Sequence, residues 1–126
     1  MPRYLSPRGI QVIRWLLLLV AFSVALLYLN GALFSFWAAG GPPTPYPEAY
    51  LQQGLRRTSY AFAIALCGFA AFRQLSRLSR IDRLALCCVG LATVVFCIPI
   101  ARAYFATDAC LDSGGRWNQL VYRCER

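Results

Sequence analysis

One run in the sequence limits how this chain can fold: residues 15–37 carry no charged side chain over 23 consecutive positions. At 1.5 Å per residue, a helix of this length measures about 34 Å and crosses a hydrocarbon core of about 30 Å. Trp15 and Trp37 stand at its two ends, where aromatic side chains gather at membrane interfaces. Because the run is longer than the apolar part of a secretory signal, we predict a membrane-spanning helix.

The rest of the chain has the composition of a membrane protein. Hydrophobic residues make up 59% and charged residues 14% of the 126 positions, whereas soluble domains contain about 25% charged residues. A soluble domain of this size could not bury so much apolar surface. We predict two further spans at residues 58–72 and 84–105, and therefore an all-α fold, a three-span bundle of transmembrane helices.

The second predicted span is short, so its helix must extend beyond the membrane. Pro47 and Glu48 suit a first helical turn, because proline fixes φ and a carboxylate favours the positive end of the helix dipole. We expect one helix from about Pro47 to Leu78, with flanking arginines reaching toward the headgroups. Residues 38–57 then hold a Gly/Pro-rich periplasmic loop and the start of this helix.

Residues 73–83 form the predicted Arg-rich cytoplasmic turn between the second and third spans. Ser79 and Asp82 match the spacing of a capping box, in which Ser79 would accept a hydrogen bond from a free helix N–H. Pro99 is expected to kink the third helix near its outer end, because proline lacks the N–H of a regular helical turn.

The distribution of charge predicts the orientation in the membrane. Residues 1–14 and 73–83 carry seven arginines and one aspartate, whereas the opposite side carries six arginines and four acidic residues. Arginine gathers on the cytoplasmic side, so the N-terminus is predicted to be cytoplasmic and the C-terminus periplasmic. All 13 basic residues are arginines, a bias typical of a GC-rich bacterial genome, and we therefore expect a bacterial inner-membrane protein.

Three arginines of the cytoplasmic turn recur at helical spacing. Arg73, Arg77 and Arg80 follow an i, i+4, i+7 pattern, which places them on one stripe of a helix. One interpretation is a docking site for an anionic partner. The other is a topology anchor that rests on anionic lipid headgroups at the cytoplasmic face.

The polar segment 106–126 contains two of the six cysteines, Cys110 and Cys124. In an oxidising periplasm these two are expected to form a disulfide, which closes a 15-residue loop and contributes about 3 kcal/mol of stability. Gly114 and Gly115 are suited to a turn. The prediction is a short disulfide-closed extracytoplasmic hairpin, with its two strands at 116–118 and 121–123.

This hairpin carries the residues that most resemble a binding surface. Aromatic and arginine side chains dominate interface hot spots, and the candidates here are Trp117, Tyr122, Arg116 and Arg123. The alternative is that Trp117 lies in the membrane interface or packs on the 38–57 loop.

The predicted spans contain small residues at the spacing that lets helices approach closely. Ala63, Cys67 and Ala71 follow this pattern and form the candidate helix-packing seam. Cys67 and the other span cysteines are interpreted as small packing residues, the others being Cys87, Cys88 and Cys97. Asn30, the one strongly polar side chain inside a span, either forms a hydrogen bond between helices or lies near the outer interface and binds water.

The sequence lacks the residues that most catalytic mechanisms use. It contains no histidine, and no acidic residue or lysine falls within the predicted spans, so proton relays and ion coupling lack their usual groups. We expect no enzyme activity, no cofactor and no metal. The +8 net charge is not accompanied by a basic groove interleaved with aromatic residues, so no nucleic-acid partner is expected.

The preferred interpretation is a non-enzymatic interaction protein that binds another membrane or periplasmic protein. Two versions remain open: an accessory subunit of a membrane complex, or an immunity-type protein against a membrane-acting toxin. The alternative class is a small-solute transporter or an oligomeric pore. That alternative needs polar side chains along a path, and the predicted spans offer few: Ser23, Asn30, Ser35 and Thr93.

Overall fold

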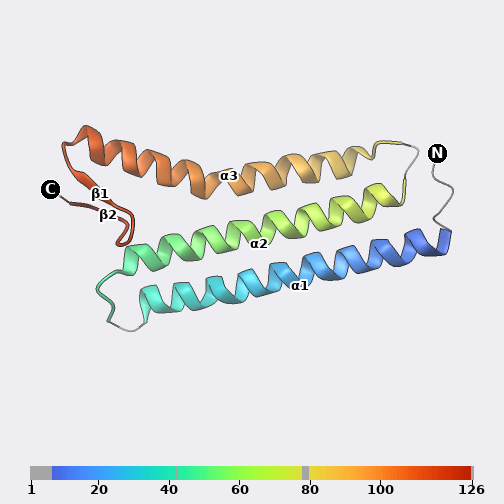
Figure 1. The fold of residues 1–126 in the computed structure, drawn as a ribbon, viewed down its shortest axis with the longest axis horizontal. Helices are drawn as coiled ribbons and strands as arrows, with labels where there is room; N and C mark the ends of the chain where they lie inside the picture. The colour runs from blue at the N-terminus through green and yellow to red at the C-terminus, as the bar shows by residue number, and fades with distance from the viewer. Residues whose placement is uncertain (1–6, 42, 78–79, 126) are drawn as a thin grey trace.

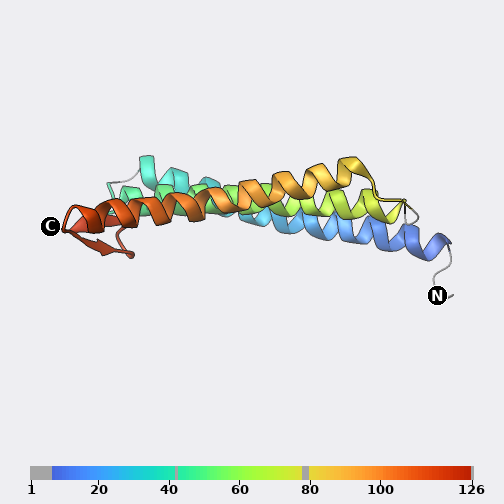
Figure 2. The same ribbon diagram turned by 90° about the horizontal axis from the view of Figure 1, so that it is seen from above.

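The computed structural model describes residues 7–41, 43–77 and 80–125, and in this part of the chain most residues are helical. The elements, in chain order, are α1 (Pro7–Gly40), α2 (Pro47–Leu75), α3 (Arg83–Asp112), β1 (Arg116–Asn118) and β2 (Arg123–Glu125). The three helices lie side by side in one flat layer with α2 in the middle (Figures 1 and 2). The C-terminal hairpin lies at one end of this layer.

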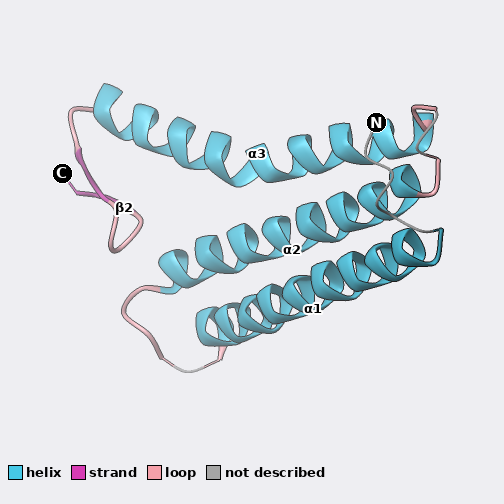
Figure 3. Ribbon diagram, turned by 45° about the vertical axis from the view of Figure 1, so that its right-hand side comes forward, coloured by secondary structure: helices cyan, strands magenta, loops and turns pink. Residues whose placement is uncertain are grey.

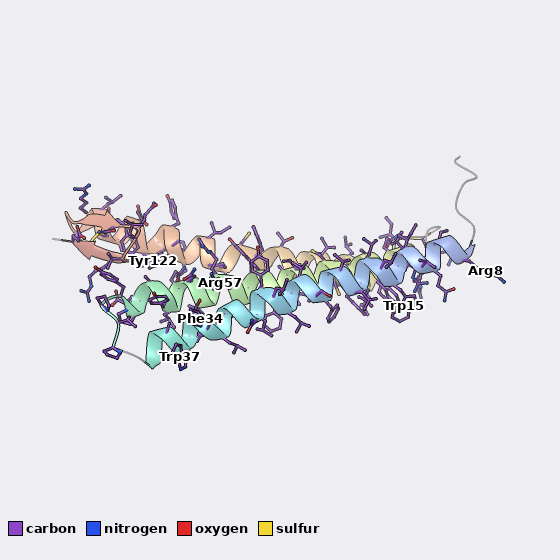
Figure 4. The ribbon with its side chains drawn as sticks, turned by 60° about the horizontal axis from the view of Figure 1, so that its bottom comes forward. Arg8, Trp15, Phe34, Trp37, Arg57 and Tyr122 are labelled. Atoms are coloured by element: carbon purple, nitrogen blue, oxygen red, sulfur yellow. A yellow bond between two sulfur atoms is a disulfide. The ribbon has the colours of Figure 1, made fainter. Side chains whose placement is uncertain are left out.

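Within the described residues, two helices are long and apolar enough to cross a membrane, namely α1 over Arg8–Gly40 and α3 over Arg83–Asp112. Only 6% of the most apolar window of α1 and 17% of that of α3 is buried inside the protein. Most of their large apolar side chains are therefore exposed on the outside of the protein. Trp15 and Trp37 lie toward opposite ends of α1 (Figure 4). The length and composition of α2 do not by themselves mark it as a third span.

Small residues bring α1 and α2 close together. A Cβ atom added at Gly68 of α2 would collide with the Cβ atom of Ala21 on α1. Ala25 and Ala32 of α1, and Ala61 of α2, are almost completely buried. Without large side chains between them, the two backbones make extended van der Waals contact, which is the main attraction between helices in an apolar solvent.

An aromatic ladder connects all three helices. The ring of Tyr28 on α1 meets the ring of Tyr60 on α2 edge to face, with centroids 6.2 Å apart. Tyr60 then stacks on Phe96 of α3 at 5.0 Å. Pairs of this kind contribute about 0.5–1.5 kcal/mol beyond the apolar area that they bury. The ladder therefore fixes the middle of the layer across its whole width.

The helix bounds confirm part of the sequence-based expectation and correct the rest. Helix α2 begins at Pro47 as predicted but ends at Leu75, and Leu78 lies outside the described residues. Helix α3 continues seven residues beyond the predicted end at 105. Residues 106–112 are therefore helical, because alanine in this segment favours a helix, and the Thr107 hydroxyl donates to the Ala103 carbonyl of the preceding turn at 2.9 Å. Pro99 lies inside α3, which changes direction along its length (Figure 1).

The disulfide predicted between Cys110 and Cys124 is present. The hairpin folds back from the end of α3 toward the start of α2 (Figure 3). Its first strand, 116–118, is as predicted, but the second is 123–125 rather than 121–123. The shift arises because the Asn118 carboxamide oxygen accepts hydrogen bonds from the backbone N–H groups of Leu120 and Val121. Residues 119–122 are thereby held in a turn.

Two glycines allow the hairpin to close, for different reasons. Gly114 has φ +74°, a left-handed conformation that glycine adopts without steric cost. Gly115 lies directly against the disulfide: an added Cβ atom would collide with the Cys124 sulfur and would lie 3.2 Å from the Cys110 sulfur. The Gly114–Gly115 pair therefore supplies both the turn and the space for the bridge.

A pair of matched glycine substitutions tests the close packing of α1 on α2. We expect Gly68→Ala to lower the free energy of unfolding by about 1–3 kcal/mol, because the new methyl group overpacks the contact with Ala21. The control is Gly90→Ala on α3, where an added Cβ atom meets nothing within 4 Å. This control should be neutral or stabilise by up to about 1 kcal/mol. Unfolding in detergent, followed by circular dichroism, measures both, and equal effects would contradict the packing account.

Candidate functional site: a cleft at the disulfide end

Where the hairpin folds back on the helices, it encloses a cleft of about 500 Å³. We call this the outer cleft. A volume in this range is typical of small-molecule sites. Helices α2 and α3 form one side and the hairpin forms the other. The lining residues are Ala49, Gln52, Gln53, Arg56, Ala103, Tyr104, Thr107, Trp117, Gln119, Leu120 and Tyr122.

Tyr122 is held in the cleft by an uncommon backbone conformation. Its φ is +59°, the one positive value at a residue other than glycine among the described residues. Its ring packs edge to face against Trp117, with centroids 5.1 Å apart, where the hairpin meets the helices (Figure 4). Its hydroxyl is buried and has no hydrogen-bond partner among the described residues. Left-handed non-glycine residues often occur at functional sites.

Gln52 supplies a second unsatisfied polar atom. The residue is only 7% exposed, and its amide N–H group makes a long hydrogen bond of 3.4 Å to the Pro99 carbonyl of α3. Its side-chain oxygen is buried without a partner in the described structure. A buried polar atom without a hydrogen bond is costly, so the oxygen is ready to accept one from a bound molecule.

The described lining of the outer cleft carries a positive charge and no negative one. Arg56 is the charged residue among the described lining residues, and none of them is acidic. Burial raises the pKa of Tyr122 above its ordinary value of 10.0, and the positive charges of Arg102 and Arg56 partly oppose this shift. The Tyr122 hydroxyl therefore stays protonated at neutral pH and can donate a hydrogen bond. The cleft combines a cation, neutral donors and acceptors, and aromatic surface.

The structure separates the four hairpin residues predicted to bind a partner. Trp117 and Tyr122 are half-buried and line the outer cleft, whereas Arg116 and Arg123 are exposed. The guanidinium of Arg123 lies 3.9 Å from the carboxylate of Glu48 at the start of α2. The aromatic pair thus faces the helices, and the arginines provide the outer surface of the hairpin.

Sequence reasoning missed the role of Arg57, which lies between α1 and α2 (Figure 4). Its guanidinium donates to the Gly31 carbonyl at 2.8 Å and to the Ser35 hydroxyl at 3.2 Å. Ser35 is 1% exposed, so these bonds connect the two helices in the interior. The available signal was the pair Arg56–Arg57 on the less basic side of the predicted topology. Asn30, for which an interhelical hydrogen bond was one of two predicted roles, is exposed.

At the opposite end, the predicted arginine stripe does not form as one helical face. Arg77 and Arg80 lie beyond the end of α2 at Leu75. The turn instead brings Arg73 within 2.8 Å and Arg77 within 3.8 Å of the Asp82 carboxylate. Asp82 precedes α3 at its N-cap position but makes no side-chain cap bond. The proposed capping partner Ser79 lies outside the described residues.

A second hollow lies midway along the helices, on the face of α2 between α1 and α3. We call it the mid-helix groove, and its volume is about 650 Å³. Its floor includes the predicted seam Ala63, Cys67 and Ala71. Ala63 is buried, whereas Cys67 is exposed and Ala71 is half-buried, so the chain's own helices cover only part of this seam. The remaining lining residues are Leu17, Val20, Ala21, Val24, Ile64, Gly68, Ala92, Thr93 and Phe96.

The span cysteines do not form a site among the described residues. No group of three or more cysteine or acidic side chains is arranged to hold a metal ion in that part of the chain. Cys67, Cys87 and Cys97 are exposed and Cys88 is half-buried. The chain's own helices therefore leave three of these cysteines uncovered, because their helix faces point outward from the single layer.

The chain matches no protein-family model, no curated protein and no solved structure at a significant level. The protein is mostly helical, has two helices long and apolar enough to span a membrane, and ends in a disulfide-closed C-terminal hairpin.

The Asp82 cluster predicts a pH dependence. The hydrogen bond from Arg73 is the main cause that holds the pKa of Asp82 below its ordinary value of 3.8, against the opposing effect of burial. A lowered pKa stabilises the folded state above the unfolded pKa, and this contribution disappears as the pH falls through the folded value. We therefore expect Asp82→Asn to be less stable than the wild type at pH 6, and the difference to shrink below about pH 4.

Thermal unfolding in detergent at a series of pH values measures this difference. The control is Asp108→Asn, which removes an exposed carboxylate at the other end of the molecule. A constant difference between the wild type and Asp82→Asn down to pH 3 would show that the Arg73–Asp82 interaction does not depend on the charge of Asp82.

Proposed function

We propose that this protein is a non-enzymatic membrane protein that works by binding another membrane protein through the mid-helix groove. The groove is the single observation that carries the proposal. It is apolar, it lies on the face of α2 between α1 and α3, and its floor contains small side chains. Such a floor allows the backbone of another helix to approach closely.

The groove suits a helix of a partner because the floor and walls differ in side-chain size. Ala63, Cys67 and Ala71 recur every four residues along the floor, whereas Leu17 and Phe96 stand on the two walls. A partner helix laid on the floor would gain van der Waals contact with all three helices. In lipid, where the hydrophobic effect between helices is absent, such contact is the main attraction.

The proposed setting is a bacterial inner membrane crossed three times. Helix α2 lies between α1 and α3 along its length (Figure 1), and its segment 58–72 is uncharged. This arrangement supports the third crossing. The arginine excess at the end formed by the α1 N-terminus and the 73–83 turn supports a cytoplasmic location for that end. The hairpin is then periplasmic, which suits its disulfide.

The cytoplasmic arginines support a second contact of the same function, with the membrane surface. Arg80 is exposed, and the side chain of Arg77 is 61% exposed. We propose that both attract anionic lipid headgroups, each contributing about 1 kcal/mol. Arg73, which is held by Asp82, belongs to the same end but is committed to the turn.

Affinity purification of the tagged protein from its native membranes in mild detergent, followed by mass spectrometry, tests the function. We expect a membrane partner to be recovered in stoichiometric amount. Ala71→Leu should reduce that recovery severalfold, because the larger side chain fills the floor of the groove. The matched control is Gly90→Leu, which adds similar bulk at an open position of α3 and should leave recovery unchanged.

Two outcomes would contradict the proposal. Recovery of the protein alone as a homo-oligomer would favour a pore or transporter instead. Equal recovery with Ala71→Leu and the wild type would exclude the groove as the binding surface. The identity of a recovered partner separates the two versions of the proposal, because a subunit of a membrane complex and a membrane-acting toxin are different proteins.

The proposed orientation makes a separate prediction. A reporter that is active only in the periplasm should be active when fused after residue 126, and inactive when fused in the 73–83 turn. A reporter that requires the cytoplasm should show the reverse pattern. Activity of the periplasmic reporter at both positions would show that α3 does not cross the membrane.

A further inference from the structure

We propose that the outer cleft binds an anionic phosphodiester that carries free hydroxyl groups, of the kind found in the headgroup of a glycerophospholipid. This inference does not depend on the mid-helix groove or on its partner. It follows from the chemistry of the side chains that the hairpin brings against α2 and α3.

The charge of the cleft selects an anion. Arg56 lines the outer cleft and Arg102 lies close enough to act on Tyr122. The described lining contains no carboxylate to neutralise either guanidinium. The two neighbouring arginines of α2 also have different roles: Arg57 is bound to Gly31 and Ser35 of α1, whereas Arg56 faces the cleft. Arginine binds phosphate strongly because its planar fork of N–H donors matches the phosphate oxygens.

The two unpaired polar atoms select a ligand with both acceptors and donors. The Tyr122 hydroxyl is buried, has no partner in the part of the chain that the structure describes, and can donate to a phosphate oxygen. The Gln52 side-chain oxygen, also buried and unpaired, needs a donor from the ligand. A hydroxyl supplies that donor, whereas an ammonium group would be repelled by the arginines. A hydroxyl-bearing phosphodiester satisfies both atoms together.

The cleft is preformed by the hairpin. The Cys110–Cys124 disulfide joins the hairpin to α3, and Gly115 leaves the space that the bridge occupies. The Asn118 turn then leads into the left-handed conformation of Tyr122. These features fix Tyr122 before any ligand arrives. Binding therefore does not incur the entropy cost of ordering this side chain.

The position of the cleft is compatible with two sources of this chemistry. The lining residues of α2 and α3 lie at 49–56 and 103–107, next to the proposed outer ends of the spans. A phospholipid of the outer leaflet could place its headgroup there. A water-soluble glycerophosphodiester could reach the same groups from the periplasm. The phosphodiester and hydroxyl chemistry is shared, and the experiment separates the two sources.

Trp117 provides the signal for the experiment. The chain has three tryptophans, at positions 15, 37 and 117, so Trp15→Phe and Trp37→Phe together leave Trp117 as the sole tryptophan. The full-length protein is titrated in detergent with glycerophosphoglycerol, the soluble probe. In a second arm it is placed in nanodiscs of phosphatidylcholine with increasing phosphatidylglycerol, the lipid probe. We expect a saturable change in Trp117 emission in at least one arm.

Three substitutions assign that change to the cleft. Arg56→Gln should weaken binding by about tenfold or more, the loss expected for a charge-assisted hydrogen bond. Tyr122→Phe keeps the ring on Trp117 and removes only the hydroxyl, so it should also weaken binding about tenfold, because this bond too is made to a charged phosphate oxygen. Arg8→Gln removes an equal charge at the far end of α1 (Figure 4) and should bind as the wild type does.

The arms distinguish every result. Saturation with the lipid probe alone identifies a lipid headgroup, saturation with glycerophosphoglycerol alone identifies a soluble ligand, and saturation with both supports the shared phosphodiester chemistry. No saturable change in either arm would overturn the proposal. The proposal would also be overturned if the Tyr122→Phe and Arg56→Gln proteins both bound as tightly as the wild type. Capture of a partner through the groove could still succeed in that case, because it depends on different residues.

Discussion

The close approach of α1 to α2 is the contact on which the rest of the structure depends. Gly68 faces Ala21 with no space for a further atom, and Ala25, Ala32 and Ala61 are buried along the same contact. Because small residues occupy the inside, most of the large apolar side chains of α1 and α3 are exposed on the outside. The flat layer of three helices follows from this division, and so does the mid-helix groove.

The two ends of the layer are stabilised by different polar interactions. At the proposed cytoplasmic end, Asp82 joins the start of α3 to Arg73 at the end of α2. Near the other end, Arg57 joins α2 to the Gly31 carbonyl of α1, and the disulfide joins the hairpin to α3. Buried polar groups normally require partners. The unpaired Gln52 oxygen and Tyr122 hydroxyl in the outer cleft are exceptions, which is why the binding proposal is placed there.

The correspondence between sequence and structure depended on how local each feature was. Three features were predictable: the start of α2 at Pro47, the Gly114 turn and the Cys110–Cys124 disulfide. The first two depend on the chemistry of a few adjacent residues. The disulfide prediction depended on the expected oxidising compartment of the tail. The predicted arginine stripe was wrong, because it assumed that periodicity alone would carry α2 through Arg80. The register of β2 was also wrong, because the Asn118 turn was not recognised.

By itself, the sequence determined that long apolar helices form and that a cysteine pair closes the tail, because hydrophobicity and local propensity are properties of the chain. The tertiary structure alone decided which small residues meet, since Gly68 and Ala21 are far apart in sequence. It also decided that Arg56 and Arg57 face opposite neighbours, and that Trp117 and Tyr122 turn toward the helices. These are outcomes of packing between elements, and no single segment contains the geometry that sets them.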